Sequence, residues 1–251
     1  MKIKSPLRYP GGKSKAVKII NQYFPPHMTK LVSPFFGGGS IEISQAINGV
    51  EVKGYDAFEP LVCFWDFLKR DRYALHARVK SYHPITKDVF KHLQSINVDM
   101  EYGLEKAAVF YVLNRSSFSG STLSGGMSQG QRFTESNMKT LLNFDLPNLT
   151  VEHKDFRESI ISHPDDFMYL DPPYLLKKGS NNLYGDRGST HKDFAHDDLF
   201  DLIKDRKNWI MSYNDSEEIT DLYQGFKMVT PEWAYGMSGD KKSKEVLIFA
   251  N

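Results

Sequence analysis

The segment that most constrains the fold is Asp171-Pro172-Pro173-Tyr174, which directly follows the apolar run Phe-Met-Tyr-Leu at 167–170. Proline has no N–H to donate to a sheet and fixes its own φ angle, so an extended strand has to end here. A buried strand that ends on an acid, two prolines and a tyrosine suggests a chemical site. The alternative is a proline-rich turn that carries a surface tyrosine.

The residues of this segment suit the activation of an aromatic amine, whose nitrogen lone pair is delocalised into the ring. If the Asp171 carboxylate and the Pro172 carbonyl accept the two amine hydrogens, the nitrogen is drawn towards tetrahedral geometry and its lone pair can face an electrophile. Tyr174 offers a face for stacking of the base. The prolines, Pro173 included, hold the acceptors in place, which is the preorganisation that such catalysis needs.

Two further expected strand ends carry groups that suit a nucleoside ligand. The pattern at 30–36 predicts a strand that leads into Gly37-Gly38-Gly39, and Ser40 is expected to cap the helix that follows. The alternating run 50–56 ends on Asp56, where one carboxylate can accept hydrogen bonds from both ribose hydroxyls. A plain turn and a helix cap are the respective alternatives.

Strand patterns alternate with helical patterns in the first and last thirds of the chain, which predicts an α/β fold with a mostly parallel sheet. Later strands are expected at 149–156, 167–170, 208–213, 226–230 and 245–251. The middle third combines helical patterns with a Ser/Gly-rich loop at 115–131. We therefore expect a catalytic domain made of 1–70 and 141–251, with 71–140 as an insertion.

Composition narrows the class of protein. The chain has 251 residues, 40% of them hydrophobic, which suffices for one sizeable core. Its single cysteine, Cys63, excludes an intrachain disulfide framework, and no apolar stretch is long enough to span a membrane. These features predict a cytoplasmic protein, in a bacterium or in a virus-infected host cell. The net charge of +1 does not indicate a polyanionic partner. The stretch 69–92 is nevertheless rich in Lys and Arg, and it is either a phosphate-contacting stretch or a solvated helix face.

Six short segments resemble, in order, the motifs of the Dam-like family of DNA adenine methyltransferases, which use S-adenosylmethionine. They are RYPGGKSK (8–15), PFFGGGS (34–40), NRSSFSG (114–120), HKDF (153–156), YLDPPY (169–174) and MSYND (211–215). The resemblance implies a Rossmann-like methyltransferase fold whose insertion recognises DNA. It also implies methyl transfer to the 6-amino group of an adenine that is flipped out of duplex DNA, without a metal. We expect a monomer, because all catalytic parts lie in one chain.

The resemblance also implies roles for single residues. Tyr9 and Lys13 would lie near the methionine end of the cofactor, Asp56 would hold the ribose, and Phe156 would stack on the adenine. The cofactor-binding residues would be Tyr9, Gly11, Gly12, Lys13, Pro34, Phe35, Gly37, Gly38, Gly39, Ser40, Asp56, Asp155, Phe156 and Asp171. The residues that contact nucleic acid would be Asn114, Arg115, Ser117, Gln129, Arg132, Lys177 and Lys178.

Target recognition departs from the family pattern. Members specific for GATC follow their Asn-Arg segment with Asn-Gly and a later Arg-x-Asn, whereas this chain reads SFSGSTLSGGMSQGQRF at 117–133. The target sequence is therefore left open. The polar segment 175–194 is expected to order over cofactor and base. A cytosine-amine methyltransferase, a catalytically silent DNA-binding protein and an RNA substrate are the alternatives.

Overall fold

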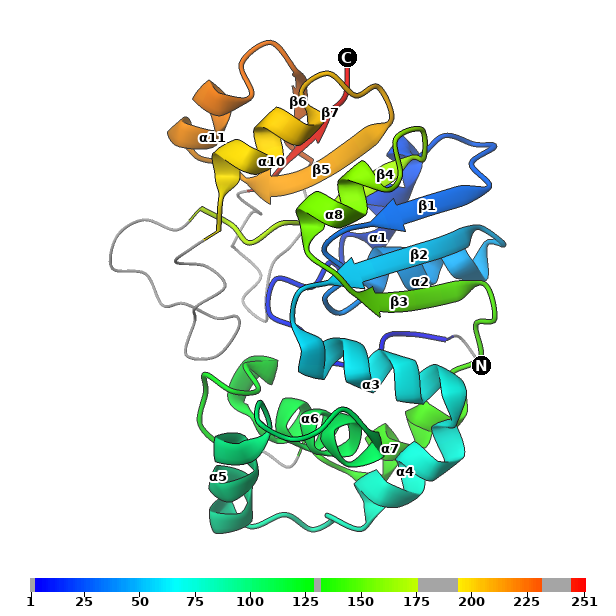
Figure 1. Ribbon diagram of the computed structural model, residues 1–251, viewed down its shortest axis with the longest axis vertical. Helices are drawn as coiled ribbons and strands as arrows, with labels where there is room; N and C mark the ends of the chain where they lie inside the picture. Colours follow the sequence, from blue (N-terminus) through cyan, green and yellow to red (C-terminus); the bar gives the residue numbers. More distant parts are fainter. Residues whose placement is uncertain (1–2, 129–131, 176–193, 232–244) are drawn as a thin grey trace.

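The computed structural model describes residues 3–128, 132–175, 194–231 and 245–251. Their strands form one sheet in the order β3-β2-β1-β4-β5-β7-β6 (Figure 1). Strands β1 to β5 run parallel, and β7 is antiparallel to both of its neighbours. The predicted α/β fold with a mostly parallel sheet is confirmed. The strand bounds are β1 Lys30–Ser33, β2 Glu51–Asp56, β3 Leu149–His153, β4 Met168–Leu170, β5 Trp209–Asn214, β6 Lys227–Val229 and β7 Glu245–Phe249.

The strand order reverses between β1 and β4. From β1 the chain proceeds outward through β2 to β3, then returns to the other side of β1 and continues through β4 to β5. Loops after β1 and β4 consequently leave the sheet in opposite directions. Ligands of open α/β sheets bind beyond the carboxyl ends of the strands at such a point.

Helices cover both faces of this sheet, and Figure 1 shows α8 and α10 on the near face and α1 and α2 on the far one. Their bounds, with those of the remaining helices that pack on the sheet, are α1 Val17–Ile20, η1 Asn21–Tyr23, α2 Ser40–Ile47, α3 Glu59–Arg70, α8 Phe156–Ile161, α10 His196–Ile203 and α11 Glu217–Leu222. The predicted capping role of Ser40 is wrong. Gly39 is the N-cap of α2, at φ 64°, and Ser40 is already the first helical residue. The chain reverses at a positive φ angle, which glycine adopts without the strain of a Cβ.

A second group of helices lies below the sheet in Figure 1, on the β3 side. Helix α3 lies between this group and the strands. It contains α4 Arg72–Lys80, α5 Lys87–Ile96, α6 Leu104–Ser116, η2 Phe118–Gly120 and α7 Glu135–Leu142. The helical character predicted for the middle of the chain is thus confirmed.

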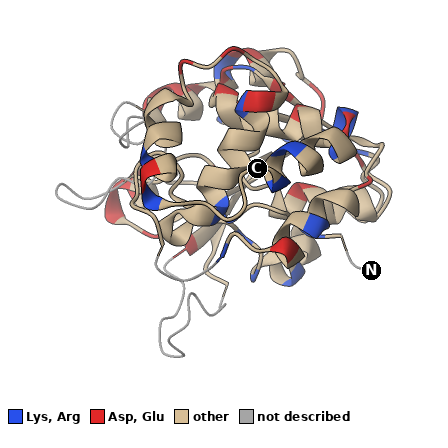
Figure 2. Cartoon of the chain, turned by 90° about the horizontal axis from the view of Figure 1, so that it is seen from below, with Lys and Arg blue, Asp and Glu red and all other residues tan. Residues whose placement is uncertain are grey.

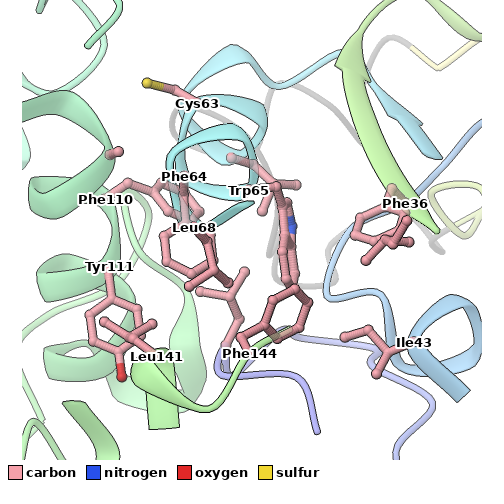
Figure 3. Packing of buried hydrophobic residues seen from close by; sticks show 14 of the residues in the cluster. Phe36, Ile43, Cys63, Phe64, Trp65, Leu68, Phe110, Tyr111, Leu141 and Phe144 are labelled. Atoms are coloured by element: carbon pink, nitrogen blue, oxygen red, sulfur yellow. The ribbon is translucent and has the colours of Figure 1, made fainter. Parts of the chain in front are cut away.

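One hydrophobic core joins the helical group to the sheet through α3 (Figure 3). The Trp65 ring lies 5.2 Å from the Phe36 ring on the sheet side and 5.6 Å from the Phe144 ring on the other. Phe64 stacks on Tyr111 of α6, with 5.6 Å between ring centroids and 13° between planes. Because large aromatic side chains fill this junction, the helical group is held firmly against the sheet.

Three basic side chains of the stretch 69–92 are engaged within the protein. Lys69 donates a 2.6 Å hydrogen bond to the carbonyl of Leu149, and Arg72 donates to the carbonyl of Phe144 at 3.0 Å. Arg78 pairs with Glu105. Figure 2 likewise shows basic and acidic segments interspersed along the chain. These contacts favour a structural role for the three side chains over a phosphate-binding one.

Candidate active site

A cavity of about 240 Å³ lies beyond the carboxyl ends of β1, β2 and β4. All residues predicted to bind the cofactor line it, together with the complete 171–174 segment. Segments that lie far apart in the sequence therefore meet at the sheet edge where the strand order reverses. The chemical roles of these residues remain predictions.

The glycine loop is shaped by two aromatic rings as well as by its own backbone. A Cβ atom on Gly38 would lie 2.7 Å from the Cβ of Tyr9, and one on Gly39 would lie 2.7 Å from the Phe36 ring. A Cβ on Gly54 would come within 2.1 Å of the same Phe36 ring. Glycines are thus needed here for packing within the chain, and the role of Gly54 was not predicted from the sequence.

Asp56 connects the end of β2 to the glycine loop. One carboxylate oxygen accepts from the Gly37 N–H and the other from the Phe58 N–H, both at 2.9 Å. Burial raises the pKa of Asp56, and these two backbone hydrogen bonds oppose the rise. Because each carboxylate oxygen has a second acceptor position, two hydroxyl groups of a ligand can still be bound.

Three phenylalanine rings form one wall of the cavity. The Phe156 ring lies 5.5 Å from that of Phe35 and 5.2 Å from that of Phe194. Asp155 caps α8 by accepting from the Arg157 N–H at 2.8 Å, which fixes Phe156 at the first helical position. Phe194 was not among the predicted site residues, because no local pattern separates it from the polar segment before it.

Lys13 and Asp171 form a buried ion pair inside the cavity. The Lys13 Nζ lies 2.8 and 2.9 Å from the two Asp171 carboxylate oxygens and donates to the Gly11 carbonyl at 2.9 Å. Burial raises the pKa of Asp171, and the Lys13 charge acts in the opposite direction. Lys13 therefore helps Asp171 to remain an ionised hydrogen-bond acceptor.

The ring of Tyr174 is held in place by contacts with two neighbouring side chains, Tyr213 and Lys13. Its ring stacks on that of Tyr213 with 5.7 Å between centroids and 22° between planes. The Lys13 Nζ lies 5.0 Å from the Tyr174 ring centroid. The ring orientation is therefore fixed beside Asp171.

Two residues predicted to contact nucleic acid are inside the protein. Asn114 accepts from the Arg8 N–H at 2.9 Å and donates to the Arg8 carbonyl at 2.8 Å and the Gly120 carbonyl at 3.2 Å. Ser117 accepts from the Thr122 N–H at 2.9 Å. Both side chains are fully buried, and their predicted contact with nucleic acid stays a prediction. They fasten the loop after α6 internally, and Asn114 also ties it to the N-terminal segment.

The predicted basic residues of this region lie nearer the surface. Arg115 is partly buried and donates to the carbonyls of Pro6 and Arg132, both at 3.4 Å, while Arg132 is exposed. The charges of Arg115 and Arg132 add to burial in lowering the pKa of Arg8. Three guanidinium groups therefore gather here. Gln129, Lys177 and Lys178 lie outside the described residues, as does nearly all of the segment expected to close over the site.

Comparison with known proteins agrees with this geometry. The family model of the D12 class N6 adenine-specific DNA methyltransferases matches residues 9–237. The chain belongs to this family. Membership confirms the resemblance to DNA adenine methyltransferases and the Rossmann-like methyltransferase fold, and it implies the use of S-adenosylmethionine in general terms.

A curated relative extends the comparison. The modification methylase StsI of Streptococcus sanguinis is 30% identical over an alignment of 211 residues that covers 72% of this chain. The match spans only 30% of that methylase, so the chain corresponds to less than a third of its length.

The described part of this D12-class chain shows neither a membrane-spanning helix nor a metal-binding cluster. None of the helices there is both long and apolar enough to cross a bilayer. Those same residues contain no group of three or more His, Cys, Asp or Glu side chains that could hold a metal ion.

Proposed function

We propose that this protein transfers a methyl group from S-adenosylmethionine to the 6-amino group of adenine in duplex DNA. The observation that carries the proposal is the position of Asp171, at the end of β4, in the same cavity as the glycine loop and Asp56. A carboxylate beside a nucleoside site is the arrangement expected for activation of an exocyclic amine.

The cavity has the groups that the cofactor requires. Asp56 retains two acceptor positions for the ribose hydroxyls, and the Phe35, Phe156 and Phe194 rings suit an adenine ring. S-adenosylmethionine supplies an electrophilic methyl group on a positively charged sulfur.

The residues beyond the cofactor would hold the target base. The Asp171 carboxylate and the Pro172 carbonyl accept the two hydrogens of the amine, which draws the nitrogen towards tetrahedral geometry and localises its lone pair for attack on the methyl group. Tyr174, fixed by its stack on Tyr213, covers one face of the base. Lys13 occupies one acceptor position on each Asp171 oxygen, leaving the second for the amine. Positioning of the reacting atoms is then the main catalytic contribution.

We assign recognition of the DNA target to the insertion 71–140 and the neighbouring N-terminal segment. Arg115, Arg132 and Arg8 gather three positive charges at this junction. Phe118, which begins η2 just after α6, is 70% exposed and can stack against a base. Arginine reads guanine edges well, so this junction is suited to base contacts.

A groove of about 800 Å³ beside the cavity suits the phosphate backbone. It is bordered by Lys4, Arg8, Lys15 and Lys18, and no Asp or Glu is among the described residues that line it. Tyr9, Gly11, Gly12 and Lys13 line both the groove and the cavity. Neutralisation of phosphates by such side chains supplies affinity without sequence information.

The test is transfer of labelled methyl from S-adenosylmethionine to mixed-sequence duplex DNA. Asp171→Asn retains the shape of the side chain but loses a charged acceptor, and we expect the rate to fall by about 10²–10³-fold. Asp221→Asn, an exposed acid on α11, is the matched control and should keep full activity. Nucleoside analysis then identifies the product: label on cytosine would replace adenine as the target, and cofactor binding without transfer to any duplex would overturn the proposal. Mass measurement in solution tests the monomer that we also propose.

A further inference from the structure

Three carboxyl side chains from three different elements surround Lys13. Asp171 follows β4, Glu245 begins β7 with its Oε1 3.8 Å from the Lys13 Nζ, and Glu42 lies on α2. Glu42 lines the same cavity, is only 3% exposed, and accepts a 2.7 Å hydrogen bond from the Ser33 hydroxyl of β1. In the proposed reaction Asp171 binds the target base, whereas Glu42 has no assigned role.

An ionised Glu42 would add a negative charge beside an ion pair that is already neutral. The Lys13 Nζ lies 2.8 Å from an Asp171 carboxylate oxygen, and the charge of Asp171 acts on Glu42. An isolated charge is costly in a buried site, so the protonated form of one carboxyl group is favoured.

Burial brings the titration of Glu42 towards neutral pH. Burial raises its pKa to about 7, and the charge of Asp171 acts in the same direction. The Ser33 hydroxyl and the charge of Lys13 oppose the rise. On β4, Tyr169 also faces the cluster, and its own pKa is raised by burial and by the three carboxylates. At pH 7, Glu42 is therefore protonated in about half of the molecules.

The proposed cofactor changes its charge during the reaction. With a sulfonium, an ammonium and a carboxylate group, S-adenosylmethionine has a net charge of +1. Its product, S-adenosylhomocysteine, has a neutral thioether and a net charge of zero. A carboxyl group in the cavity wall that can lose its proton therefore interacts differently with the two ligands.

We propose that Glu42 makes the cavity prefer the sulfonium cofactor to its thioether product, by releasing a proton when the cofactor binds and regaining one after methyl transfer. This inference rests on the proposed function. The proton balance closes without another reactant. The first proton goes to solvent on binding. When the methyl group leaves sulfur for nitrogen, the amine loses one proton as Glu42 takes one up. Glu42 is a positioning residue in this scheme, since it acts through charge and touches no reacting atom.

The test is calorimetric binding of the two ligands in buffers that differ in ionisation enthalpy, which measures protons released without any turnover. At pH 7 the wild type should release about half a proton more with S-adenosylmethionine than Glu42→Gln does. The ligand's own amino group titrates equally in both proteins and cancels in this difference. S-adenosylhomocysteine should show no such difference. Glu51→Gln, an exposed acid on β2, is the matched control and should behave as the wild type.

Affinity gives a second readout. From pH 6 to pH 8 the wild-type preference for S-adenosylmethionine over S-adenosylhomocysteine should rise by about tenfold relative to that of Glu42→Gln. Equal proton release by wild type and Glu42→Gln would overturn this inference and leave the proposed function intact. The same holds if Glu42→Gln loses affinity equally for S-adenosylmethionine and S-adenosylhomocysteine. Failure of the wild type to bind either ligand would instead overturn the proposed function and this inference with it.

Discussion

Replacement of Lys13 by Met would isolate the ion pair with Asp171. The Lys13 side chain is 3% exposed and that of Asp171 22%, so solvent screens the pair only weakly. At the observed N–O distances of 2.8 and 2.9 Å, the attraction is about 6 kcal/mol at an effective dielectric constant of about 20. The desolvation of both groups offsets much of this attraction.

Methionine leaves the Asp171 carboxylate buried without its counter-charge. We therefore expect Lys13→Met to lower the free energy of unfolding at pH 7 by about 2–4 kcal/mol. For a chain of this length, that corresponds to a fall in Tm of about 4–16 °C. The folded-state pKa of Asp171 is already raised and should rise further in the variant. Since ionised Asp171 is then the destabilising form, the gap between wild type and variant should widen as pH rises from about 4 to 7.

Denaturant unfolding across this pH range measures the effect. Lys13→Met combined with Asp171→Asn removes both charges and should recover more than half of the loss, whereas the exposed control Lys207→Met should change stability by less than about 0.5 kcal/mol. A loss below about 1 kcal/mol at pH 7, or no recovery in the double variant, would refute the reasoning.

Three further substitutions test other parts of the chain. Asn114→Ala leaves the Arg8 N–H and several carbonyl groups without their buried partner. The free energy of unfolding, measured by chemical denaturation, should therefore fall by about 2–4 kcal/mol, and an unchanged value would contradict the anchoring role. Phe156→Leu removes an aromatic face, and the free energy of binding S-adenosylmethionine should weaken by about 1–3 kcal/mol in calorimetry; unaltered affinity would exclude stacking on Phe156. Lys15→Glu combined with Lys18→Glu should weaken DNA binding and lower the slope of log affinity against log salt by about 0.9 for each lost phosphate contact, and an identical slope would remove the groove from the DNA path.

Much of the sheet could be predicted because its signals are local. The apolar run before Asp171, the alternating run that ends on Asp56, and the glycines after β1 each report their structure through neighbours in sequence. Parallel strands end at one edge of a sheet, so their terminal residues were expected to meet, and they line one cavity.

The prediction for Ser40 failed for an equally local reason. A serine before a helical pattern resembles an N-cap, but the reversal of the chain requires a left-handed residue, and Gly39 provides it. The burial of Asn114 and Ser117 was not predicted, because a polar residue next to a Ser/Gly-rich loop looks exposed in sequence. Their burial depends on the N-terminal segment and the loop folding back over α6.

The sequence by itself determined the strand ends and the chemical types at them: a carboxylate, two prolines and a tyrosine after one strand, glycines after another and an acid after a third. Tertiary structure alone decided which charges share the cavity. Lys13 reaches Asp171 across 158 residues of chain, and Glu42 and Glu245 join them from α2 and β7. The physical reason is that backbone preferences act between sequence neighbours, whereas burial and charge pairing depend on how complete elements pack together.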